Sequence, residues 1–115
     1  ETQNSPPADG GREASASSSV NERLAKRIPA YLKNCRENVA AMSAALDRVD
    51  FETLRYLGHQ MSGSGGAFGF QPITDFGAAI QLASQSADTA VSRRHLHDFS
   101  IYLDVAEADL ALAAL

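Results

Sequence analysis

The chain has 115 residues, a length that fits a single domain, and 44% of them are apolar, which is enough for a modest core. Its formal charge of −4 and its scattered basic residues argue against a nucleic-acid surface, which would need a basic patch. The lone cysteine, Cys35, excludes an intramolecular disulfide and favours a reducing, cytoplasmic compartment. No run of about 18 apolar residues is present, so we expect this segment to make no membrane contact.

Residues 1–19 are rich in Ser, Ala, Gly and Pro and contain no aromatic residue and no aliphatic residue larger than alanine. Such a segment cannot bury enough surface to order itself and is typical of a flexible linker or tail. We therefore expect the folded domain to occupy residues 20–115, with another domain before the linker in a longer parent protein. The alternative is an appended tail with no domain before it.

From Val20 onward the apolar residues recur at helical spacing, and no alternating pattern typical of strands competes with it. The first apolar stripe comprises Leu32, Cys35, Val39, Met42 and Leu46. Because proline is tolerated in the first turn of a helix but not in its middle, Pro29 predicts a short helix before it and a long one after it.

Three further helices are expected after the long one. Asp50 is a candidate N-cap for the first, Gly69 suits a left-handed stop after it, and Pro72 suits the first turn of the second. Asp88 marks the break before the last helix. The residues expected to face the core from these helices are Leu54, Leu57, Gly58, Met61, Ile73, Phe76, Ile80, Ala83, Leu96, Phe99, Leu103, Ala106 and Leu110. The sequence therefore predicts an all-α fold, an antiparallel four-helix bundle with a short extra N-terminal helix.

One histidine, His59, lies in the glycine-rich run of residues 57–70. Each glycine inside a helix costs about 1 kcal/mol relative to alanine. A helix that contains several glycines usually does so because another backbone or a partner approaches it closely. The alternative is a glycine-rich loop with an incidental surface histidine.

The helical phase places His59 towards solvent, about 140° from the centre of the buried face of its helix. Helical side chains lean towards the N-terminus, so residues 62 and 63 would lean back over His59, yet Ser62 is small and Gly63 has no side chain. His59 is therefore expected on an open shelf that continues to Gly66 and is accessible to a large, flat partner. We assign Arg55 and Gly66 to this docking surface.

Gln81 is expected beside His59, because the two positions are equally far from a turn near residue 70 in a helical hairpin. Its amide could contact one ring nitrogen of His59 and fix which tautomer faces outward. The alternative is a glutamine that is only solvated.

These residues resemble the histidine-containing phosphotransfer (HPt) domains of multistep bacterial phosphorelays. The family signature is a histidine, followed by a lysine three residues on, a glycine four on and another glycine ten on. Here those positions are His59, Ser62, Gly63 and Gly69. The resemblance covers residues 22–113 and includes three further similar stretches, at residues 28–32, 50–54 and 77–80.

The resemblance implies that His59 accepts a phosphoryl group from the phospho-aspartate of a response-regulator receiver domain and passes it to another receiver. It also implies that Gln81 sits where some members place a glutamine in contact with the histidine. Neutral imidazole is a good nucleophile near neutral pH, and phosphoryl transfer depends mainly on positioning and charge neutralisation. The chain departs from the family pattern at Ser62, where lysine is usual, and this departure bears on the efficiency of transfer.

No glycine-rich nucleotide loop joined to a strand is visible, so we expect a phosphorelay intermediate without autokinase activity. We expect no cofactor on this chain, and Mg²⁺ would be supplied at the site of the partner receiver. The other expected partner is a histidine kinase or hybrid kinase, with this domain as the C-terminal part of a hybrid sensor kinase.

Two alternatives belong to other classes of protein. A metal site would draw on Cys35, His59, His95 and His97, but the last two lie about 200° apart on one helix and cannot bind the same ion, so we expect no metal. A docking module that binds a receiver or kinase without being phosphorylated stays open because of Ser62. Transfer of a phosphoryl label from a receiver to this chain would distinguish that module from a phosphotransfer domain.

Overall fold

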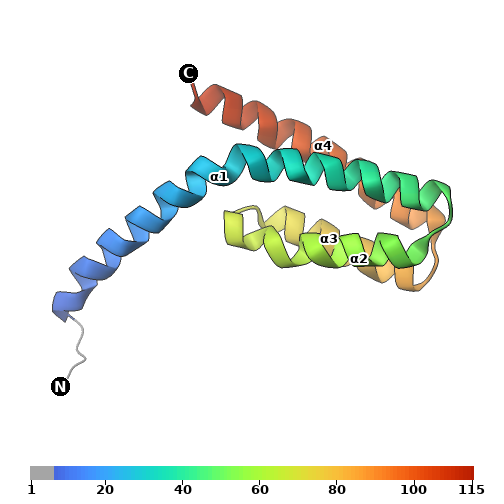
Figure 1. Cartoon of the computed structure of the whole chain (residues 1–115), viewed down its shortest axis with the longest axis horizontal. Coiled ribbons are helices and arrows are strands. Elements are labelled where there is room, and N and C mark those ends of the chain that lie inside the picture. The colour runs from blue at the N-terminus through green and yellow to red at the C-terminus, as the bar shows by residue number, and fades with distance from the viewer. Residues whose placement is uncertain (1–6) are drawn as a thin grey trace.

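The computed structural model of the protein describes the backbone of residues 7–115 and the side chains of residue 23 and of residues 25–115. This part of the chain contains no strands and comprises the helices α1 (Pro7–Asp47), α2 (Phe51–Ser64), α3 (Gln71–Gln85) and α4 (Thr89–Ala113), with a short 3₁₀ turn, η1 (Gly66–Phe68), after α2. Each helix packs on two others: α1 and α3 both contact α2 and α4 (Figure 1). The predicted all-α four-helix class is therefore confirmed.

The core is formed by the apolar stripes that the sequence predicts. Complete burial of a large apolar side chain contributes about 1.5–3 kcal/mol, so these stripes decide which face of each helix turns inward. The buried apolar residues are Tyr31, Leu32, Cys35, Met42, Ala45, Leu46, Leu54, Met61, Ile73, Ile80, Ala83, Leu96, Phe99, Leu103 and Ala106. Val39, Leu57, Phe76 and Leu110 lie partly buried against this core. In the described part of the chain, none of the helices has the length and apolar character needed to cross a membrane.

The N-terminal helix differs from its prediction. Pro29 lies inside α1 instead of separating two helices, so the extra short helix predicted before it does not exist as a separate element. Instead, α1 changes direction where it leaves the bundle (Figure 1). An internal proline removes one backbone hydrogen bond and clashes with the carbonyl four residues earlier, and either a kink or a break can relieve that clash.

Residues 7–19, for which the composition predicts a flexible linker, are helical because α1 begins at Pro7. Residues 1–6 lie outside the described residues. Composition indicates that this segment has no core face to bury, but it does not exclude a helix that extends from the packed part of α1. This part of α1 extends away from the other helices (Figure 1). The domain boundary near residue 20 stays a prediction.

Aspartate caps set the start of α2 and of α4. The Asp50 carboxylate accepts hydrogen bonds from the Thr53 hydroxyl at 2.7 Å and from the Thr53 backbone N–H at 3.1 Å. These bonds lower the pKa of Asp50. The Asp88 carboxylate accepts a hydrogen bond from the Val91 backbone N–H at 3.0 Å. The N-cap predicted at Asp50 is confirmed, and it fixes the residue at which α2 begins.

Candidate functional site

The backbones of α2 and α3 touch beside His59, and this contact requires glycine. A Cβ atom on Gly77 would lie 2.4 Å from the backbone nitrogen of Ser62 and 2.6 Å from the carbonyl oxygen of Gly58. A Cβ atom on Gly58 would lie 3.0 Å from the carbonyl oxygen of Gly77. Side chains on α3 can therefore reach the exposed face of α2 from a short distance.

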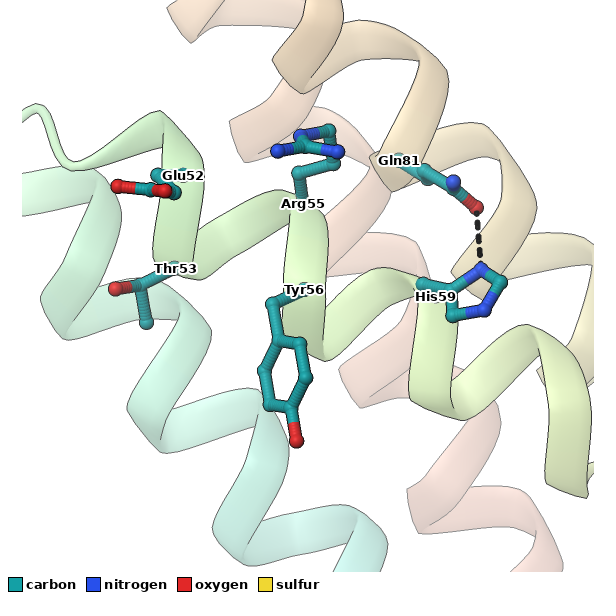
Figure 2. A pocket seen from close by; sticks show the side chains of 6 residues that line it. All are labelled: Glu52, Thr53, Arg55, Tyr56, His59 and Gln81. Atoms are coloured by element: carbon teal, nitrogen blue, oxygen red, sulfur yellow. Dashed lines mark hydrogen bonds between the residues drawn. The ribbon is translucent and has the colours of Figure 1, made fainter.

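His59 is exposed on α2, as its helical phase predicts. Its Nδ1 atom lies 3.4 Å from Oε1 of Gln81 on α3 (Figure 2). Because an amide oxygen only accepts hydrogen bonds, this contact requires the proton of the neutral ring to be on Nδ1. The other ring nitrogen, Nε2, then carries the lone pair and points away from Gln81 (Figure 2). The predicted contact between the two side chains is present.

A shallow hollow of about 490 Å³ surrounds the ring. Its lining residues are Glu52, Thr53, Arg55, Tyr56, His59 and Gln81. Arg55 and Gln81 lie on the same side of α2, whereas Tyr56 points the opposite way (Figure 2). The Tyr56 hydroxyl accepts a hydrogen bond from the Gln60 amide at 2.9 Å. The hollow therefore has charged and polar side chains, Arg55 and Gln81, towards α3 and an aromatic ring on the other side, and the carboxylate of Glu52 also lines it.

Next to His59, Ser62 and Gly63 leave the surface open. The Ser62 hydroxyl donates a hydrogen bond to the backbone carbonyl of His59 at 2.7 Å, so its oxygen is turned back onto its own helix. A Cβ atom on Gly63 would have no heavy atom within 4 Å outside its own stretch of α2. The structure therefore has the open shelf that the sequence predicts at these two positions.

Gly66 is exposed, but it does not continue the strip of α2 as predicted. The helix ends at Ser64, and Gly66 begins η1, where its backbone N–H donates to the Thr74 hydroxyl at 2.8 Å. The chain must turn here to reach α3, which it does with Gly69 at φ 85° and with the Phe70 N–H bound to the Gly65 carbonyl at 2.9 Å. Tertiary hydrogen bonds thus end the helix earlier than the apolar pattern indicates.

Tyr31 supports this turn from α1, a role that the sequence analysis missed. Its ring stacks on Phe68 with centroids 4.1 Å apart, and its hydroxyl lies 2.8 Å from the hydroxyl of Ser64. Burial raises the pKa of Tyr31, so the phenol stays protonated and keeps this hydrogen bond. Glu52 and Tyr56 were also not predicted for this site, although both precede His59 at helical spacing, which is a signal that they share its face.

The residues weighed for a metal site lie apart from this hollow. Cys35 is buried in the core, and His95 and His97 lie on α4 and do not line the hollow. Among the described residues, no group of three or more His, Cys, Asp or Glu side chains is arranged to hold a metal ion.

Comparison with known families agrees with this geometry. The family model of the Hpt domain matches residues 28–114. The chain therefore belongs to the Hpt domain family, whose members are helical bundles that act in histidine phosphotransfer with receiver and kinase partners, and which are not kinases themselves. No curated protein and no solved structure matches the chain.

Proposed function

We propose that His59 is the residue through which this domain relays phosphoryl groups, from the phospho-aspartate of one receiver domain to the aspartate of another. The observation that carries the proposal is the orientation of the ring. His59 is exposed, Gln81 holds its Nδ1 atom, and Nε2 is directed outward over a shelf without bulky side chains. This arrangement leaves one nucleophilic nitrogen accessible to a globular partner.

In the proposed transfer, the Nε2 lone pair attacks the phosphorus in line. The P–N bond forms as the P–O bond to the aspartate breaks, and the carboxylate leaves with the electron pair. Positive charge develops on the ring during this step, and the Nδ1 proton is already directed at the amide oxygen of Gln81. That hydrogen bond strengthens as the charge grows, so Gln81 stabilises the transition state more than the resting histidine.

The remaining site residues have supporting roles in this proposal. Ser62 and Gly63 leave room for the receiver to approach His59, and Arg55 and Gly66 contribute to its docking surface. The acidic pocket of the receiver holds the Mg²⁺ that neutralises charge on the transferring group. This chain binds no cofactor, takes no part in autokinase chemistry, and serves as the C-terminal phosphotransfer domain of a hybrid sensor kinase.

A second function is favoured by one observation, the presence of Ser62 where Hpt domains usually have lysine. A domain that lacks this cation could bind a receiver or kinase as a regulatory partner without being phosphorylated. The two functions share the same hollow around His59 and differ only in whether a covalent bond forms.

Incubation with a phosphorylated receiver in the presence of Mg²⁺ tests the proposal. We expect the label to move from the receiver to this chain, and we expect the variant His59→Gln to bind the receiver and remain unlabelled. Tight binding without labelling of the wild-type domain would instead support the docking function.

A further inference from the structure

We propose that Arg55 is the cation that neutralises the phosphoryl group carried by His59, in place of the lysine that is absent at position 62. This inference rests on the proposed phosphorylation of His59 and assigns the charge on which that chemistry depends. It gives Arg55 a role within the domain itself, before any partner is bound.

The need for such a cation follows from the charge of the phosphoryl group. A phosphohistidine carries a group with up to two negative charges, and phosphoryl transfer is governed mainly by positioning and by the neutralisation of that charge. Ser62 supplies no charge, and its hydroxyl is bound to the carbonyl of its own helix. Any positive charge that this domain itself provides, in addition to the Mg²⁺ of a receiver, must therefore come from another residue near His59.

Arg55 is in the right place to supply it. Among the six residues that line the hollow, Arg55 is the one with a permanent positive charge. It precedes His59 by four residues, so their Cβ atoms are about 5–6 Å apart on the surface of α2. In Figure 2 the ring of His59 extends towards the C-terminal end of α2, and the guanidinium of Arg55 lies nearer the N-terminal end, so the long arginine side chain must swing along the helix surface to meet a phosphoryl group on the ring. The guanidinium also lies on the α3 side of α2, as does Gln81 (Figure 2).

Arg55 is also free to move towards a new anion. It is exposed, and it forms no ion pair with any residue that the structure describes. Other arginines are held by carboxylates: Arg36, Arg48 and Arg93. Glu52, one turn before Arg55, lines the same hollow without an ion pair to it. The guanidinium can therefore turn from solvent to a phosphoryl group and bind two of its oxygens, a geometry that arginine favours.

A test without any receiver separates this role from docking. Phosphoramidate phosphorylates histidine directly: the bond from phosphorus to Nε2 forms as the bond to nitrogen breaks, and ammonia leaves. The pKa of the resulting phosphoryl group is then measured by ³¹P NMR titration in the wild type and in Arg55→Gln, Arg55→Lys and Arg94→Gln. Arg94 is the matched control, because it is an exposed arginine on α4 that does not line the hollow.

A nearby cation favours the dianion and lowers the pKa of the phosphoryl group. We therefore expect Arg55→Gln to raise that pKa by about half a unit or more, with a smaller effect at high salt. Arg55→Lys should recover most of the wild-type value, and Arg94→Gln should match the wild type. Transfer from a phosphorylated receiver should slow by about threefold to tenfold in Arg55→Gln.

An unchanged titration in phosphorylated Arg55→Gln would overturn the inference. If that variant also bound the receiver more weakly, Arg55 would be a docking residue only. A wild-type domain that phosphoramidate does not modify would contradict the proposed function, and this inference with it. Because Arg55 is exposed, the variants are expected to keep the wild-type melting temperature.

Discussion

The Nδ1 atom of His59 lies 3.4 Å from the Oε1 atom of Gln81, so a residue on α3 determines which ring nitrogen of α2 faces outward. The same two helices touch through Gly58 and Gly77, and this contact brings Gln81 within reach of the ring. The orientation of the His59 ring therefore depends on helix packing. The two glycines let the backbones of α2 and α3 meet, and this contact places Gln81 beside the ring.

Removal of the acceptor on Gln81 should release the ring. In Gln81→Leu, Nδ1 loses its partner, and we expect transfer to slow by about tenfold to a hundredfold, since a hydrogen bond to a group that becomes charged contributes about 1.5–3 kcal/mol. Gln81→Glu keeps an acceptor and serves as the control. Single-turnover transfer measures the rate, and ¹⁵N NMR of the imidazole reports the tautomer. A Gln81→Leu variant with the wild-type rate and tautomer would show that Gln81 has no influence on the ring.

Two glycines should respond in opposite ways to added bulk. In Gly63→Leu the Cβ atom meets no heavy atom within 4 Å outside its own stretch of α2, and leucine improves helix propensity by several tenths of a kcal/mol. Stability should therefore hold or rise, while transfer falls sharply because the side chain leans over His59. Gly77→Ala places a Cβ atom 2.4 Å from the Ser62 nitrogen, and the free energy of unfolding should fall by about 1–3 kcal/mol. Thermal unfolding and transfer assays measure both effects. A destabilised Gly63→Leu with normal transfer would mean that Gly63 is a packing residue.

Restoring the family lysine should add a second cation near the phosphoryl group. In Ser62→Lys, the ammonium can approach the phosphoryl oxygens to about 5 Å, and we expect transfer to speed up by about threefold to thirtyfold. Added salt should reduce this gain, because the site is exposed. The gain should be larger in an Arg55→Gln background, where no other cation lies in the hollow.

Single-turnover transfer and the lifetime of the phosphohistidine provide the two readouts for Ser62→Lys. A cation that acts in the transition state raises the rate, whereas one that stabilises the phosphohistidine equally lengthens its lifetime instead. If neither quantity changes, the charge at position 62 is irrelevant, and Ser62 acts only as a small residue that keeps the shelf open.

Val49 offers a test of the fold that leaves the site untouched. It follows α1 at φ 57°, and the Asp50 N–H binds the Ala45 carbonyl at 2.8 Å across it, an arrangement in which glycine is the usual residue. A β-branched residue is unfavourable at positive φ. We expect Val49→Gly to raise the free energy of unfolding by up to about 1 kcal/mol in denaturant titrations, without altering transfer. A loss of stability would indicate that Val49 contributes more by its contacts than it loses by its backbone conformation.

Most of the bundle could be predicted because its signals are local. The apolar spacing that defines the core faces and the Asp50 cap depend on neighbours within one or two turns, and both appear in the structure. The exposure of His59 follows from the same helical phase. The position of Gln81 beside His59 could be predicted as well, because the position of the turn in a helical hairpin fixes which residues of the two helices lie side by side.

The remaining features depend on contacts that no local pattern encodes. α1 continues through Pro29 where a break was predicted, because a change of direction within a helix can relieve the same clash as a break. The end of α2 depends on a hydrogen bond from Gly66 to Thr74 of another helix. The sequence also does not distinguish a glycine that faces a neighbouring backbone, such as Gly77, from one that faces solvent, such as Gly63. That difference arises only once α3 is packed on α2.

The most direct test of the central claim is the site of phosphorylation. After incubation with a phosphorylated receiver and Mg²⁺, intact-mass and fragmentation spectrometry under conditions that preserve phosphohistidine should find one phosphate, located on His59. The phosphate should be absent in His59→Gln and retained when both His95 and His97 are replaced by glutamine. Phosphate that persists in His59→Gln, or that maps to His95 or His97 in the wild type, would contradict the assignment of His59 as the phosphoryl carrier.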